Sequence, residues 1–208
     1  VDVHEQRGNA IKLLNRIIWK AHHKTKGIHL ANISGGDKHN AIPREAYAII
    51  GLKDAAKAEE IMKEEAEAIL HEYKPIDPNF SFKLTKTDIP KKMLKNDSKE
   101  KILNTLHGLP HGVDKMSYDI EGLVETSTNL AKVTIEGDDT CIMLSSRSSI
   151  MSALQDLRDR IHAIVLLAGG TVEEEEPYPG WKPNLDSKVL QLGKDLYKKK
   201  YGNEPVVE

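Results

Sequence analysis

The order in which helix-like and strand-like patterns follow one another most restricts the fold of this 208-residue sequence. Apolar residues at helical spacing, alternating apolar residues and turn-forming Gly and Pro residues divide the first half into five elements. They are a helix over 9–22, strands over 28–33 and 44–52, a helix over 54–73 and a strand over 80–84. Asn9 is placed to cap the first helix, and Gly35-Gly36 separates the first two strands.

The same order recurs in the second half. A capping-box spacing at Asp97–Glu100 opens a short helix that Gly108 ends. Strands over 122–136 and 140–145, a helix over 149–168 and a strand over 171–176 follow. Because helix, strand, strand, helix, strand occurs twice, the sequence predicts two similar structural units.

These units are expected to have an α+β fold of the ferredoxin-like kind, each with an antiparallel sheet covered on one face by helices. Their predicted limits are about 1–95 and 96–182. A ferredoxin-like unit begins with a strand, so the first one is expected upstream of Val1, in a longer protein. Residues 183–208 contain a separate amphipathic helix that ends at Gly202 and is too short to be stable alone.

Charge and composition exclude some classes of partner. With 30 Lys and Arg against 32 Asp and Glu, the net charge of −2 gives no electrostatic reason to expect nucleic acid or an anionic membrane. No apolar stretch approaches the roughly 20 residues of a membrane span. The single cysteine, Cys141, lies in an apolar run and is expected to be buried, and it permits no internal disulfide. A cytoplasmic location fits these features best.

Metal ligands are not clustered in an obvious way. His107 and His111 have the closest spacing of a ligand pair, but Gly108 and Pro110 break the helix between them, and an ordinary surface turn is the simpler interpretation. Glu173–Glu176 is acidic, yet alternate residues of a strand face opposite sides, which favours a solvated edge. No metal site and no catalytic residue is therefore predicted within this sequence.

Two polar loops could bind a ligand instead. Arg147 stands among four serines at 145–149, and its guanidinium offers the fork of donors that matches a carboxylate. Asn40 precedes Pro43, which stiffens the loop that holds its amide. The alternatives, a solvent-exposed arginine and a turn-forming asparagine, remain open from the residues alone.

A family resemblance bears on this choice. The chain resembles bacterial aminoacyl-histidine dipeptidases, also called Xaa-His or cytosol non-specific dipeptidases, nearly from end to end. These are two-metal peptidases related to carnosinase and carboxypeptidase G, in which a lid and dimerisation domain interrupts the catalytic domain. The motifs that carry the resemblance are His39-Asn40-Ala41-Ile42-Pro43-Arg44-Glu45-Ala46, Pro110-His111-Gly112-Val113, the run from Gly122 to Leu130, and Ser146-Arg147-Ser148-Ser149.

The resemblance implies that residues 1–182 are the lid and dimerisation domain and that 183–208 returns toward the catalytic domain. It assigns substrate binding to Asn40, Arg147 and the adjacent His39, with Arg147 on the C-terminal carboxylate of a dipeptide. It also implies a homodimer and two divalent metal ions, zinc by preference, in the complete enzyme. The family's metal-binding motifs and general base are missing here, so the chain itself is expected to bind no metal and to be inactive.

A different class of function remains open. Two ferredoxin-like units could instead form a non-enzymatic module that binds a small molecule or another protein. Metal-dependent activity of the complete protein would separate the two hypotheses.

Overall fold

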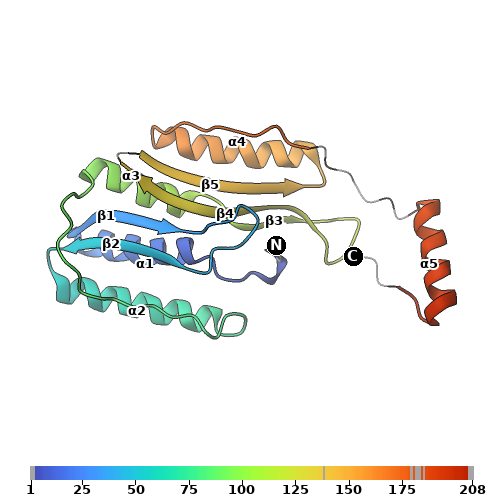
Figure 1. Cartoon of the computed structure of the whole chain (residues 1–208), viewed down its shortest axis with the longest axis horizontal. Coiled ribbons are helices and arrows are strands. Elements are labelled where there is room, and N and C mark those ends of the chain that lie inside the picture. The colour runs from blue at the N-terminus through green and yellow to red at the C-terminus, as the bar shows by residue number, and fades with distance from the viewer. Residues whose placement is uncertain (1–2, 138, 179, 181–183, 185, 206–208) are drawn as a thin grey trace.

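The computed structural model describes residues 3–137, 139–178, 180, 184 and 186–205. The chain has the predicted α+β fold (Figure 1). Its first half contains a 3-10 turn at Val3–Glu5, α1 (Ala10–Thr25), β1 (Ile28–Gly35), β2 (Ala46–Leu52) and α2 (Ala55–Tyr73). Its second half contains α3 (Asn96–Gly108), β3 (Gly112–Met116), β4 (Val124–Glu136), β5 (Asp139–Ser148), α4 (Met151–Leu167) and α5 (Lys188–Tyr201).

The strands of both halves form one antiparallel sheet of five strands rather than two separate sheets. The long strand β4 joins them. One edge of β4 pairs with β5 from Thr126 to Glu136. The other edge pairs first with β3 and then, at Val133, with Gly35 of β1, beyond which β2 completes the sheet. The predicted repeat is therefore found only in part, as α1, β1, β2, α2 in the first half and α3, β3, β4, β5, α4 in the second, and the two halves share one sheet.

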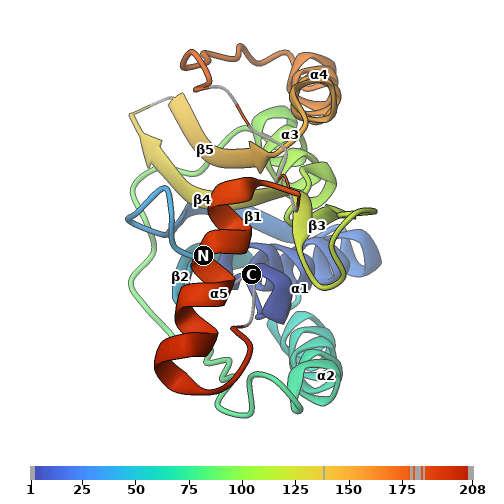
Figure 2. The ribbon, with the colours of Figure 1, turned by 90° about the vertical axis from the view of Figure 1, so that its right-hand side faces the viewer.

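Helices α1 to α4 all lie on one face of this sheet, as the end-on view shows (Figure 2). The core between the layers is aliphatic. Fully buried side chains from every layer meet there, among them Ile11, Ile17, Ile18, Leu30, Ile33, Met62, Ile69, Leu103, Leu106 and Leu130. The loop between β1 and β2 lies on the opposite face (Figure 2). The predicted covering of one face by helices is therefore confirmed.

Polar contacts fix α1 at the centre of the helical layer. As predicted, Asn9 caps it, and its Oδ1 accepts hydrogen bonds from the N–H groups of Ile11 and Lys12 at 3.0 and 3.2 Å. Further along, Arg16 and Lys20 both bind Glu65 of α2, whose side chain is 2% exposed. A buried carboxylate is tolerated when it is paired in this way, and the pairing fixes α1 against α2.

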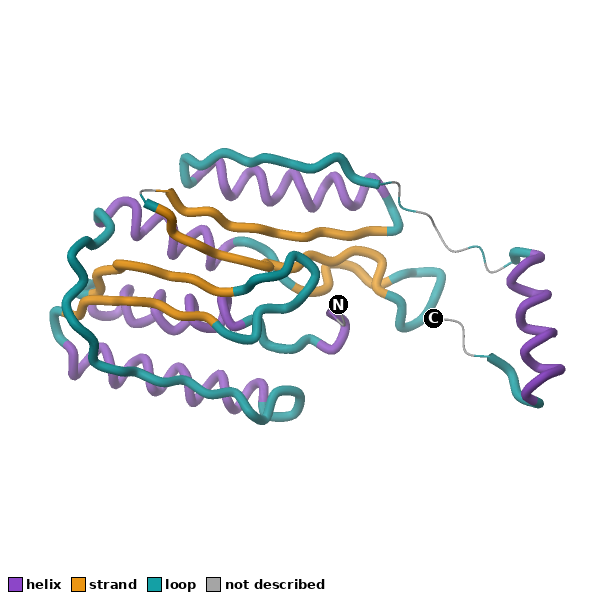
Figure 3. The backbone as a smooth tube through the Cα atoms, in the orientation of Figure 1, coloured by secondary structure: helices purple, strands orange, loops and turns teal. Residues whose placement is uncertain are grey.

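Two predicted strands are absent, and one strand was missed. Residues 80–84 and 171–176 are extended segments outside the sheet (Figure 3). Phe80, Phe82 and Leu84 nevertheless pack against the core, so their period of two reflects one buried side without strand pairing. The strand β3 has only five residues and begins at Gly112, where the sequence showed only a turn.

The last helix stands apart from the core. None of the residues of α5 is buried, and its apolar side chains Val189, Leu192 and Leu196 are exposed. The predicted limit between 182 and 183 falls outside the described residues. Among the described residues, no helix combines the length and the apolar character that crossing a membrane would require.

Candidate binding site on the open face of the sheet

The loop 36–45 between β1 and β2 carries His39 and Asn40 and is pressed against β4. Gly36 has a φ of +72°, and a Cβ at this position would overlap the backbone carbonyl oxygen of Ala131. Only glycine fits here, both for its backbone conformation and for the close approach. At the other end of the loop, the N–H of Ala10 donates to the carbonyl of Pro43 at 2.9 Å. The loop is therefore tied to β4 and to the start of α1.

Asn129 of β4 supplies the central anchor of this loop. Its Nδ2 donates to the backbone carbonyls of His39 and Ala41, at 3.2 and 2.8 Å. These two carbonyls flank Asn40, so the backbone on both sides of Asn40 is fixed. Asn129 is only 4% exposed, which places the loop close against the sheet.

Arg147 lies on the same face of the sheet. Thr126 and Thr128 are buried and hydrogen-bond to Ser148 and Ser146, which places these four side chains together on the helix-covered face. Because alternate residues of a strand face opposite sides, Arg147 must project to the open face. Arg147 is paired with Ser127, two residues from Asn129. Arg147 and Asn129 are therefore diagonal neighbours on the sheet, and residues in such positions lie about 7 to 8 Å apart.

The guanidinium of Arg147 is exposed, and no hydrogen bond or ion pair engages it within the described part of the chain. Arg16 binds Glu72, Arg158 binds Glu174 and Arg160 binds Asp114. Arg44, in the loop 36–45, is exposed like Arg147 and also has no hydrogen bond or ion pair among the described residues. A guanidinium left unpaired beside a fixed loop is available for an external anion.

The backbone of β4 beside this site is held by two more side chains. Directly after Leu130 the strand has a bulge at Ala131, where β4 passes from β3 to β1. The Leu130 N–H donates to Nδ1 of His111 at 3.3 Å, and Nδ2 of Asn9 donates to the Leu130 carbonyl at 2.8 Å. Burial lowers the pKa of His111 to about 4, so the ring is neutral and can accept this bond. On this edge of β4, neither β3 nor β1 pairs with Leu130, and these two side chains bond its N–H and carbonyl groups instead.

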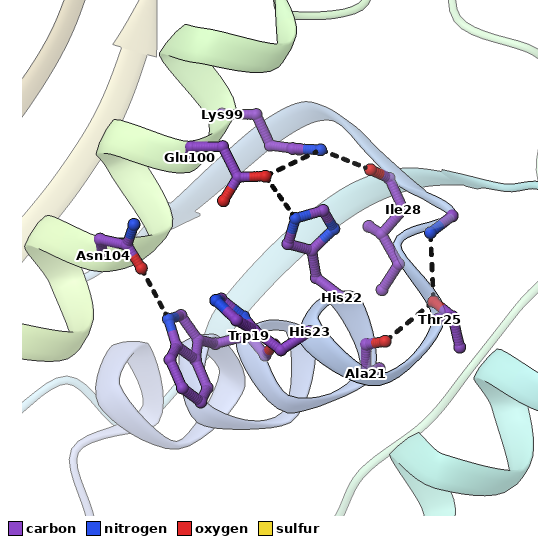
Figure 4. A network of polar contacts seen from close by, with 10 residues as sticks. Trp19, Ala21, His22, His23, Thr25, Ile28, Lys99, Glu100 and Asn104 are labelled. Carbon is purple, nitrogen blue, oxygen red and sulfur yellow. Dashed lines mark hydrogen bonds and ion pairs between the residues drawn. The ribbon is translucent and has the colours of Figure 1, made fainter.

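His107 and His111, whose spacing suggested a metal pair, contact different parts of the fold: His111 bonds to Leu130 of β4, and His107 stacks on Trp19 of α1. The His107 ring stacks on Trp19 at 4.4 Å, and His23 stacks on Trp19 at 3.9 Å. Close by, Trp19 Nε1 donates to Asn104, and His22 contacts Glu100 at 2.6 Å (Figure 4). Burial lowers the pKa of His22 although Glu100 opposes this shift. These contacts join α1 to α3.

The rest of the described chain offers no cluster of metal ligands either. Within the described ranges, no group of three or more His, Cys, Asp or Glu side chains could hold a metal ion. Glu174, from the predicted acidic strand, instead binds Arg158 and His162 of α4. Cys141 is exposed on β5 rather than buried as predicted, because its position alternates with the core-facing Ile142.

A cavity of about 490 Å³ lies on another side of His111, between the N-terminal turn, the end of α2 and the start of β3. Neither Asn40 nor Arg147 lines it.

The sequence predicted the three exposed candidates, His39, Asn40 and Arg147, but not the residues that hold the backbone around them. Asn129, His111 and Asn9 act through backbone groups far away in the sequence. The only signal for Asn129 was that it lies in a motif of the family resemblance.

The chain resembles part of a peptidase. Residues 2–77 match the family model described as a peptidase dimerisation domain. The whole chain is 30% identical, over 211 residues, to the cytosol non-specific dipeptidase of Escherichia coli K12. Its fold matches the crystal structure of aminoacylhistidine dipeptidase from Vibrio alginolyticus with a TM-score of 0.91, at 30% identity and over 98% of this chain.

The resemblance predicted from the sequence motifs is thereby confirmed, and it concerns a peptidase dimerisation domain within a dipeptidase. The chain spans 43% of the length of the Escherichia coli relative and 42% of the Vibrio chain.

Proposed function

We propose that this chain is the lid and dimerisation part of a metal-dependent dipeptidase that hydrolyses Xaa-His and other dipeptides. The observation that carries the proposal is the unpaired guanidinium of Arg147, which shares the open face of the sheet with the anchored loop of Asn40. Such a pair offers a charged fork for a carboxylate and, on a backbone that is held in place, an amide for a polar group of the substrate. The relatives named above are dipeptidases.

Arg147 would bind the free C-terminal carboxylate of the dipeptide, and Asn40, with His39 beside it, would bind the peptide nearer the scissile bond. A fixed separation between these groups favours one substrate length. Only a dipeptide places both its carboxylate and its scissile carbonyl at that separation, which favours dipeptidase over endopeptidase activity.

The position of the candidate site at one end of the body supports the proposed role of this chain as a lid. The loop 36–45 and the N-terminal end of the chain lie at the same end of the body (Figure 1). In the proposed complete enzyme, the catalytic domain would face this end of the body, and with it Asn40 and Arg147. The exposed apolar side of α5 fits the same arrangement, with residues 183–208 returning to that domain. Closure would bring the polar groups to the substrate and exclude water.

We propose that the metal ions are held elsewhere in the complete enzyme, as the resemblance to two-metal peptidases implies. We therefore assign no chemical step to a metal within this chain. Its own residues bind the substrate and orient it. We also propose a homodimer formed through residues 2–77, the part that matches a dimerisation domain, and a cytoplasmic location.

The test is hydrolysis by the complete protein and by the isolated 208-residue chain. We expect the complete protein to cleave Xaa-His dipeptides, to lose this activity with a chelator and to regain it with zinc. The isolated chain should cleave none and bind no zinc tightly in calorimetry. A complete protein that hydrolyses no dipeptide with any divalent metal would favour the non-enzymatic module.

A further inference from the structure

Asn129 joins the two parts of the candidate site. Its side chain holds the loop on either side of Asn40, through the carbonyls of His39 and Ala41. Its backbone belongs to β4, which is paired with the strand that carries Arg147. Any movement of Asn129 relative to this loop would therefore change the separation between Asn40 and Arg147.

The strand position that carries Asn129 is itself fixed. The next residue, Leu130, has its N–H held by His111 and its carbonyl held by Asn9. Both contacts act at the bulge, where the regular pairing of β4 shifts register. Asn129 thus extends from a fixed segment of backbone to the loop.

The side-chain amide of Asn129 has one defined orientation, and its oxygen lacks a hydrogen-bond partner among the described residues. Both of its donated hydrogen bonds go to carbonyl oxygens, so a flipped amide would place oxygen against oxygen. Its Oδ1 is buried and has no hydrogen-bond partner among the described residues. Burying an acceptor without a donor costs about 1 to 3 kcal/mol. What distinguishes Asn129 is therefore where its two N–H groups donate: both go to the carbonyls that flank Asn40, so the side chain fixes the backbone of that loop.

We propose that Asn129 is a positioning residue that sets Asn40 at the correct distance from Arg147 for a dipeptide. This inference rests on the proposed function. Asn129 would not touch the substrate. It would act through Asn40, and its loss would leave the carboxylate contact of Arg147 in place.

The test is a double-mutant cycle in the complete dipeptidase. We expect Asn129→Ala to lower kcat/KM for a free dipeptide by about 10- to 100-fold, since misplacing a binding group by about 1 Å can cost this much. Most of the loss should be in kcat, because the carboxylate contact remains. The double variant Asn40→Ala with Asn129→Ala should be no worse than Asn40→Ala alone, as expected for a residue that acts through another.

The matched control is Asn15→Ala. Asn15 is also a buried asparagine whose Nδ2 donates to a backbone carbonyl, that of Leu103 at 3.1 Å, and whose Oδ1 has no partner among the described residues, but it lies between α1 and α3. This variant should lose stability and keep its kcat. If Asn129→Ala fails to fold, Asn129→Ser keeps one donor and should show the same coupling to Asn40 with a smaller loss.

Hydrogen exchange gives a readout independent of activity. In the Asn129 variant, the amides of residues 38–41 should exchange faster than in the wild type, and in the Asn15 variant they should not. Additive losses in the cycle, or an active Asn129→Ala beside an impaired Asn40→Ala, would overturn the positioning role alone. An unimpaired Asn40→Ala would remove the proposed function of Asn40, and this inference with it.

Discussion

The two halves of the candidate site are built in opposite ways. Loop 36–45 is anchored by Gly36 against β4, by Asn129 at its centre and by Ala10 at Pro43. Arg147 is on β5, exposed, with no partner for its guanidinium among the described residues. The anchored backbone of the loop is already ordered before a ligand binds, while the arginine side chain still has to become ordered. One half is preorganised, and the other completes its contacts only with an anion.

The largest effect is expected at the arginine. Arg147→Ala in the complete enzyme should cost about 2 to 5 kcal/mol of transition-state stabilisation, the range for removing one partner of a buried charge pair. Arg147→Lys should restore only part of it, because a point charge lacks the bidentate fork. The measurement is kcat/KM on free dipeptides and on the same dipeptides with an amidated C-terminus, where the loss should be much smaller.

Arg160→Ala is the control for that comparison. Arg160 is also exposed, but it binds Asp114 and Asp156, so its loss should change stability slightly and activity not at all. Equal losses of Arg147→Ala on free and amidated substrates would mean that the arginine does not recognise the carboxylate.

The anchoring of the loop is tested at Gly36. Gly36→Ala forces a side chain into a left-handed conformation and against the Ala131 carbonyl, and should lower the free energy of unfolding by about 2 to 4 kcal/mol. Gly137→Ala is the matched control, since Gly137 has a φ of +66° with no atom near its missing Cβ. It should cost about 1 kcal/mol. Similar values for both variants in urea unfolding would show that the close contact with β4 contributes nothing.

The support behind the loop should depend on pH through His111. Its pKa is lowered from the ordinary 6.5 to about 4, so the unfolded chain binds the proton more readily than the folded one. The free energy of unfolding should therefore fall as the pH drops from 6.5 toward 4, by about 3 kcal/mol from this residue.

Urea unfolding between pH 4 and pH 7 measures this contribution of His111 to the free energy of unfolding. His111→Gln cannot titrate and should show a shallower dependence than the wild type. If His111→Gln and the wild type fall in parallel, protonation of His111 is not what weakens the fold in acid.

The smallest effect is expected at the sheet surface. Tyr47 and Ile49 are exposed by 63% and 39% on the edge strand β2, within the part that matches a dimerisation domain. Ile49→Asp should weaken a homodimer about tenfold, or about 1.4 kcal/mol, as measured by sedimentation. Met143→Asp, at a similar exposure of 43% on the opposite edge strand, should not. The reverse result would move the interface to β5.

Sequence reasoning predicted the three exposed candidates because such residues reveal themselves by type and motif. An arginine among serines and an asparagine before a stiffened loop can be recognised locally. The anchors could not be predicted in the same way. Asn129 bonds to residues about ninety positions away, and an asparagine in a strand pattern carries no sign of its partner.

The sequence alone determined the local elements, because each depends on near neighbours. The spacing of apolar residues in α1, α2 and α4, the cap at Asn9 and the turn signal between β4 and β5 all act over a few residues. Tertiary structure alone decided that both halves share a sheet, that 80–84 packs without pairing, and that Asn40 and Arg147 occupy one face. The periodicity of apolar residues indicates which side of an element is buried. Only contacts between residues far apart in the sequence decide which other element that side packs against.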